Sequence, residues 1–186
     1  MPSDEQLAHE VQKGEVAALD ELVERHHSSL IGFLYRMTGG ERSLAEDLAQ
    51  EAFIRVIKAI QTYQYPRPFK HWLYAIAINL VRDHYRKIDL GYSISSLTNH
   101  WEDEGLQVAS PSTEELVQNE EEKSNLLAAL KALPIQQREV FVLRYYQELP
   151  LADIAALLTI PVGTVKSRLS LGLQRLRETM EEFQHQ

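Results

Sequence analysis

The stretch LADIAALLTIPVGTVKSRLSLGLQRLR, residues 151–177, decides the fold of the C-terminal part of the chain. Apolar residues recur every three or four positions on both sides of a break at 159–161, which predicts two helices joined by a tight turn. Pro161 has no N–H and suits the start of a new helix. We therefore expect one helix over 152–158 and a second from about Val162, packed together as a helix-turn-helix.

The second of these helices has the charge pattern of a DNA-binding helix. Its cationic side chains are Lys166, Arg168, Arg175 and Arg177. No acid lies between positions 162 and 177, and a cationic stripe opposite a buried stripe suits a helix in the major groove. The polar residues placed to read bases are Thr164, Lys166, Ser167 and Ser170. A helical hairpin with a solvated basic face has the same pattern, so both interpretations stay open here.

Composition narrows the class of protein. The chain has 186 residues, 44% of them hydrophobic, which is enough for one domain or two small ones with a real core. It has no cysteine, and its one close histidine pair, His26-His27, points apart on a helix, so we expect no metal and no cofactor. The N-terminus MPSDEQLAHE is acidic, unlike a signal peptide, and no apolar run approaches the ~20 residues of a membrane span. These features predict a cytoplasmic protein without membrane insertion.

The net charge of −8 comes from one internal segment. Residues 88–124 carry nine Asp or Glu against one Lys, whereas the parts before and after are nearly neutral. The overall charge therefore says little about partners, and local patches say more.

Helical periodicity runs through most of the chain. Before position 88 we expect four helices, with capping boxes at Ser3–Gln6 and Ser43–Glu46, a stop at Gly39-Gly40 and a loop over 63–68. Residues 88–112 lose the periodicity and read as a linker, and Ser112 would cap the helix that follows. The predicted fold is all-α, with two small helical domains over 1–87 and 113–186 joined by a flexible acidic linker over 88–112.

The segment 52–88 mixes cations with aromatic rings. Its cations are Arg55, Lys58, Arg67, Lys70, Arg82, Arg86 and Lys87, against the single acid Asp83. Cations neutralise phosphates, and aromatic rings stack on bases only when those bases are unstacked. The mixture therefore favours single-stranded or melted nucleic acid. We expect Tyr74 and Phe53 in the core, and Tyr63 and Tyr65 free on their loop.

Two longer stretches resemble a known family. LAEDLAQEAFIRVIKAI (44–60) with FKHWLYAIAINLVRDHYRK (69–87) resembles region 2 of bacterial RNA polymerase sigma factors, and ALPIQQREVFVLRYYQELPLADIAALLTIPVGTVKSRL (132–169) resembles region 4. With only these regions and a short linker, the chain is similar to the extracytoplasmic-function (ECF) group. The resemblance implies a transcription initiation factor, not an enzyme, that binds core polymerase, directs it to specific promoters and helps melt the −10 element.

The resemblance also implies roles by position. Contact with the β′ clamp of core polymerase falls on Asp47, Gln50, Glu51, Phe53 and Arg55. Contact with the −10 element falls on Tyr63, Tyr65, Arg67, Phe69, Trp72, Asn79, Arg82 and Arg86. Contact with the −35 element falls on Thr164, Lys166, Ser167, Arg168 and Ser170. The implied partners are the β′ and β subunits, promoter DNA as duplex and as melted non-template strand, and an anti-sigma factor.

Some features depart from the family or fit other functions. Leu171 and Leu173 stand where the family usually has basic residues, and they suit contact with a partner protein instead. A stand-alone helix-turn-helix regulator would bind duplex DNA without polymerase, and an adaptor would bind proteins only. An enzyme is disfavoured because the chain shows no catalytic triad, glycine-rich phosphate loop or metal cluster.

Overall fold

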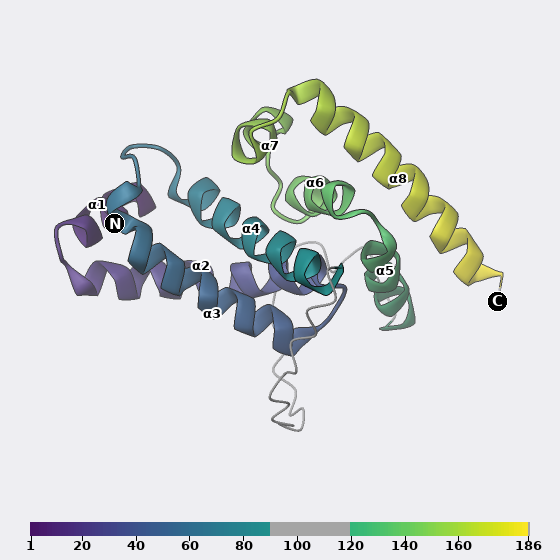
Figure 1. Cartoon of the computed structure of the whole chain (residues 1–186), viewed down its shortest axis with the longest axis horizontal. Helices are drawn as coiled ribbons and strands as arrows, with labels where there is room; N and C mark the ends of the chain where they lie inside the picture. Colours follow the sequence, from purple (N-terminus) through teal and green to yellow (C-terminus); the bar gives the residue numbers. More distant parts are fainter. Residues whose placement is uncertain (90–119, 186) are drawn as a thin grey trace.

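The structure, a computed structural model, describes residues 1–89 and 120–185, and every regular element in these two ranges is helical. The first range forms α1 (Asp4–Gln12), α2 (Val16–Met37), α3 (Arg42–Ala59), the 3-10 turn η1 (Ile60–Thr62) and α4 (Phe69–Asp89). The second forms α5 (Glu120–Ala132), α6 (Ile135–Tyr145), α7 (Leu151–Leu158) and α8 (Val162–Gln184), as Figure 1 shows. The predicted all-α class is confirmed. The cap at Ser112 and all but the first two residues of the predicted linker lie outside the described residues.

One of the two predicted capping boxes is confirmed and the other is wrong. At α1 the Gln6 backbone N–H donates to Ser3 Oγ (3.2 Å), and the Ser3 N–H donates to Gln6 Oε1 (2.8 Å). At α3 the helix starts at Arg42, ahead of Ser43, and has no side-chain cap. Two glycines with positive φ turn the chain at 39–40, so that helical geometry resumes before Ser43 is reached. Glu46 instead pairs with Arg42 one turn earlier (3.0 Å).

Helices α1, α3 and α4 pack around α2, with Tyr74 of α4 in the middle of the contact. The Tyr74 ring packs edge-on against Phe33 with 4.9 Å between centroids, and its hydroxyl lies 2.7 Å from Ser29 Oγ. Only 1% of Tyr74 is exposed, which confirms its predicted place in the core. Phe53 of α3 is also buried, as predicted.

Tyr74 predicts a loss of stability in alkaline solution. Burial raises the pKa of Tyr74 to about 12, whereas an unfolded tyrosine titrates near 10. The resulting stability is complete below pH 10 and is lost as the pH rises toward 12, because the unfolded phenol ionises first. Between pH 9 and pH 11, Tyr74→Phe should lose about 1.4 kcal/mol less unfolding free energy than the unmodified chain. Urea unfolding followed by circular dichroism at both pH values measures this, and equal losses would contradict it.

The predicted helix-turn-helix is confirmed in α7 and α8. The two helices are bent by 105° at their junction, where Thr159 adopts the left-handed conformation (φ 57°) and Pro161 immediately precedes α8. Ile154 and Ala155 of α7 are buried against the helix that follows. Among the described helices none alone is long and apolar enough to cross a membrane; α7 and α8 meet that test only when taken together.

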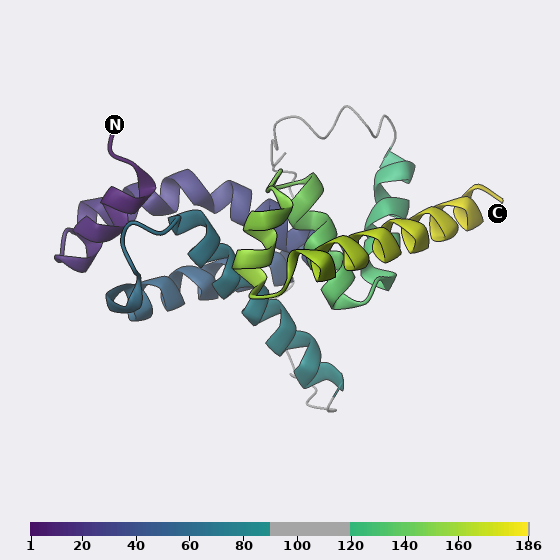
Figure 2. The same ribbon diagram turned by 90° about the horizontal axis from the view of Figure 1, so that it is seen from above.

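The two helical halves pack directly on each other, which the sequence did not predict. Helix α6 lies against α2, α7 lies against α4, and α5 lies against α2 (Figures 1 and 2). The buried apolar side chains of both halves form one continuous cluster. The surfaces of the two halves are therefore held in a fixed relation to each other.

Candidate partner and nucleic-acid interfaces

One face of α3 combines polar and aliphatic side chains at the surface. Asp47, Gln50 and Arg55 are exposed, and Arg55 Nε donates to Glu51 Oε1 (3.3 Å). Ile54 is 37% exposed on this same face. An aliphatic centre with a polar rim is typical of a protein-docking surface. Sequence reasoning missed Ile54, although an isoleucine four positions after Gln50 on a polar helix face is a readable signal.

Phe53 takes no part in that exposed face. It is 7% exposed, packs in the core, and stacks on His27 of α2 with 6.4 Å between ring centroids. Its place among the predicted polymerase contacts therefore becomes one of support for α3.

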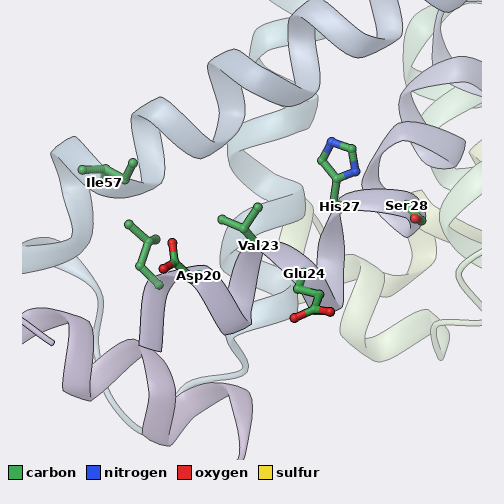
Figure 3. Close-up of a pocket in the computed structure, with 7 residues that line it drawn as sticks. Asp20, Val23, Glu24, His27, Ser28 and Ile57 are labelled. Atoms are coloured by element: carbon green, nitrogen blue, oxygen red, sulfur yellow. The ribbon is translucent and has the colours of Figure 1, made fainter. Parts of the chain in front are cut away.

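A shallow groove runs beside the α3 face, between α2 and α3 (Figure 3). Its lining residues are Leu19, Asp20, Val23, Glu24, His27, Ser28 and Ile57. Ile57 of α3 is 49% exposed and faces Val23 and Asp20 of α2 across the groove. Nowhere in 1–89 and 120–185 do three or more His, Asp or Glu side chains gather as metal ligands would. The groove therefore extends the docking face with one aliphatic and one acidic wall.

The loop before α4 is tied to α1, and this buries Tyr63. Gln12 Nε2 donates to the carbonyl oxygens of Ile60 and Tyr63 (both 2.8 Å), and the Tyr63 hydroxyl donates to the Arg67 carbonyl. Tyr63 is only 4% exposed, so the prediction that it stands free is wrong. Tyr65 is 50% exposed and stacks on His9 of α1 (5.0 Å between centroids), which confirms the prediction for that ring.

Aromatic side chains at the start of α4 form a small cluster with Tyr63. Phe69 is fully buried, and its backbone N–H donates to Glu5 Oε1 (3.2 Å). Burial opposes ionisation of Glu5, yet hydrogen bonds from backbone and side-chain donors, including the Phe69 N–H, lower its pKa overall. Trp72 is partly buried, 5.3 Å from the Tyr63 ring and 6.0 Å from the Phe69 ring. Tyr63 and Phe69 thus support Trp72 from below.

The remaining predicted −10 residues of α4 lie on one face with Trp72. Positions 72, 79, 82 and 86 recur at helical spacing, Asn79 is exposed, and Arg86 pairs with Asp83 (2.7 Å) at the surface. Arg82 turns toward the C-terminal half, where its Nε donates to Glu139 Oε2 of α6 (3.0 Å). The structure therefore brings Trp72, Asn79 and Arg86 together at the surface and engages Arg82 elsewhere.

On α8 the predicted −35 residues divide in a similar way. Lys166, Ser167 and Ser170 are exposed, and Ser167 Oγ donates to the Thr164 carbonyl (3.1 Å). Arg168 instead points toward α6, with its Nη1 3.8 Å from Glu139 Oε1. The outer face of α8 can contact a partner through Lys166 and the two serines without moving any buried side chain.

The two departures from the family also differ from each other. Leu171 is 50% exposed on α8, whereas Leu173 is partly buried against the core. Of the pair, Leu171 is thus the one available to a partner protein.

Comparison with known proteins places both halves. Residues 22–90 match the family described as Sigma-70 region 2, and residues 123–176 match Sigma-70, region 4. The chain is similar to the ECF RNA polymerase sigma factor SigW of Bacillus subtilis (strain 168), with 35% identity over 180 residues that cover 94% of this chain and 95% of SigW.

Two solved structures share the fold. CnrH in complex with the cytosolic domain of CnrY gives a TM-score of 0.69 at 23% identity, over 96% of this chain and 97% of that one. The sigma factor RpoE in complex with the anti-sigma factor NepR, from Bartonella quintana, gives 0.64 at 21% identity, over 87% and 96%. At these identities the likeness concerns the fold alone.

Proposed function

Because the chain belongs to the ECF-type RNA polymerase sigma factors, which are transcription initiation factors that direct RNA polymerase to promoters, we propose a distinct role for each of its surfaces. Residues 1–87 serve as region 2, residues 88–112 as linker and residues 113–186 as region 4. The protein works in the cytoplasm, where polymerase and chromosome meet.

The α3 face docks on the clamp of the polymerase β′ subunit, and region 4 contacts the β subunit. Asp47, Gln50, Glu51 and Arg55 supply the polar rim of the α3 face, and Ile54 supplies its aliphatic centre. The observation that carries this assignment is the separation of surfaces within region 2. A polar–aliphatic face suited to protein lies on α3, while the cation–aromatic face suited to nucleic acid lies on α4.

The α4 face and its preceding loop hold the melted −10 element on the non-template strand. Trp72 and Tyr65 offer rings on which flipped bases stack, and Arg67 and Arg86 offer charge to phosphates. Each captured base exchanges lost duplex stacking for contacts with the protein. Base capture by this face is therefore the step that helps open the promoter.

The outer face of α8 reads the −35 duplex and sets the position of the complex. Lys166→Ala is expected to lower the slope of log affinity against log salt concentration by about 0.9, because one phosphate contact is lost. Filter binding of holoenzyme to a promoter fragment at several salt concentrations measures the slope. Lys13→Ala removes an exposed lysine at the end of α1, away from all three surfaces, and should leave the slope unchanged.

An anti-sigma factor is a further proposed partner. The RpoE structure that shares this fold holds the anti-sigma factor NepR. In this chain the exposed Leu171 on α8 offers an apolar contact where the family usually has a cation. Such a partner would compete with DNA for this end of α8.

Run-off transcription with purified core polymerase and a genomic promoter library tests the proposed function. We expect transcripts from a specific set of promoters only when both core enzyme and this chain are present. Duplex binding by the free chain as tight as that of the holoenzyme, in a gel shift with and without core, would favour a stand-alone regulator. Transcription that does not change when the chain is added would favour an adaptor.

A further inference from the structure

Glu139 of α6 is a fully buried carboxylate at the junction of the two halves. Arg82 of α4 donates its Nε–H to Oε2 (3.0 Å) and an Nη2–H to Oε1. Arg168 of α8 lies 3.8 Å from Oε1. A buried carboxylate is stable only when cations and donors compensate for its lost hydration. One side chain therefore joins a proposed −10 residue to the helix proposed to read the −35 element.

The residue before it in the chain strengthens the same junction. Arg138 is 4% exposed and donates across the junction to the carbonyl of Met37, the last residue of α2. It also donates to the carbonyls of Lys131 and Leu133 in its own half, and its guanidinium lies 5.3 Å from the ring centre of Tyr85 on α4. Neighbouring charged residues thus fix α6 to both α2 and α4.

The turn after α2 fits closely against α5. A Cβ atom at Gly39 would lie 2.5 Å from Lys131 Cβ, and one at Gly40 would lie 3.2 Å from Leu127 Cδ1. The first distance is shorter than any ordinary contact, so a side chain at Gly39 would push α5 away from α2. The contact between the halves therefore has shaped backbone as well as paired charge.

Further polar contacts follow the junction away from Glu139. Arg36 lies 4.0 Å over the ring of Tyr146, and Ser29 Oγ lies 3.5 Å from Gln147 Oε1. The junction therefore covers one side of α2 and α4 over several turns, as the close approach of these helices in Figures 1 and 2 also shows.

The dimensions of a promoter do not match this packed arrangement. The −10 and −35 elements lie about 25 base pairs apart by their names, which is on the order of 80 Å of duplex at ~3.4 Å per base pair. Regions 2 and 4 in contact cannot occupy both elements at once. Reading both elements requires separation of the halves, and separation breaks the Arg82–Glu139 pair.

We propose that the free chain masks its own −10 surface in this closed arrangement, with Glu139 as the latch that occupies Arg82. The inference rests on the proposed function, because it assigns Arg82 to the −10 strand. Binding to core polymerase supplies the free energy that separates the halves and returns Arg82 to the α4 face. The net strength of the latch is limited by the desolvation of Glu139, which keeps it reversible.

Glu139→Gln tests the latch in the free chain. It preserves side-chain size and removes the charge that compensates Arg82. Since the chain has no cysteine, dyes attached at Glu24→Cys on α2 and Gln174→Cys on α8 report the separation of the halves by energy transfer. We expect lower transfer in Glu139→Gln. We also expect about tenfold tighter binding of a fluorescein-labelled single strand carrying the −10 sequence of a promoter found by run-off transcription, if the open form was about a tenth of the population.

Glu181→Gln is the matched control, because it makes the same chemical change on the exposed part of α8. It should behave as the parent chain in both measurements. A folded Glu139→Gln variant with unchanged transfer and unchanged strand affinity would overturn the proposal.

A cross-link tests the same proposal in the opposite direction, and decides it if Glu139→Gln fails to fold. Ser29→Cys and Gln147→Cys place the only two thiols of the chain on opposite sides of the junction, where a short bismaleimide can join them. The cross-linked chain should lose promoter-directed transcription with core polymerase, whereas the same variant without cross-linker keeps it. Equal transcription with and without the cross-link would overturn the latch alone, whereas no transcription in either case would overturn the proposed function.

Discussion

Ile57→Glu is expected to remove most of the affinity of this chain for core RNA polymerase without unfolding it. Ile57 is 49% exposed at the edge of the α3 docking face, beside Ile54. A central aliphatic anchor of a docking surface commonly contributes about 2–4 kcal/mol, which is roughly a 30- to 1000-fold change in affinity. The introduced carboxylate adds an unpaired charge that docking would have to dehydrate. Titration of dye-labelled chain with core enzyme, followed by fluorescence anisotropy, measures the affinity.

Ile88→Glu is the matched control for this experiment. Ile88 is 51% exposed near the end of α4, outside the α3 face, so the same substitution there should leave affinity for core enzyme unchanged. Circular dichroism checks that both variants keep their helix content. Wild-type affinity in Ile57→Glu, or equal losses in both variants, would mean that polymerase docks elsewhere.

Local sequence signals predicted the helices well and their caps less well. Ser3 and Gln6 form the predicted capping box because the chain before α1 is free to adopt the extended cap conformation. Ser43 has the same spacing to Glu46, yet the glycine turn at 39–40 starts the helix before it. A cap motif is thus overridden when the preceding turn already sets the helix in register.

The placement of aromatic rings near α4 depended on distant contacts that periodicity does not contain. Tyr65 and Tyr63 stand in the same loop, and the sequence predicted both as exposed. Gln12 of α1 binds the Tyr63 carbonyl and draws that ring into the core, whereas Tyr65 stays at the surface. Which ring of a loop is buried is decided by the element that docks on it, about fifty positions away in the chain.

The junction between the halves was likewise beyond sequence reasoning. Glu139 lies in an amphipathic helix where a glutamate normally faces water, and its partner Arg82 is 57 positions away. Linker composition suggested two independent domains, because a polar acidic segment between helical blocks predicts nothing about whether their surfaces match. The match arises from shape and buried charge, as at Gly39 and Arg138, and these are properties of the folded surfaces.

Trp72→Ala is expected to impair promoter opening far more than duplex binding. Trp72 is the partly exposed ring of the cluster that Tyr63 and Phe69 support, and it shares a face of α4 with Asn79 and Arg86. Stacking of a base on such a ring contributes about 1–3 kcal/mol, so the open complex should become roughly 5- to 150-fold less populated. The −35 contacts on α8 are untouched, so closed-complex affinity should change little.

Permanganate reactivity of promoter thymines measures opening, and a gel shift of holoenzyme at low temperature measures duplex binding. Trp72→Phe keeps a ring on the same support and should recover much of the opening, because stacking needs an aromatic face more than the indole N–H. A purely structural role for Trp72 would lower both measurements together, through loss of the ring from its cluster. Permanganate reactivity equal to that of the parent chain in Trp72→Ala would remove Trp72 from the base-capturing surface and leave Tyr65 as its exposed ring.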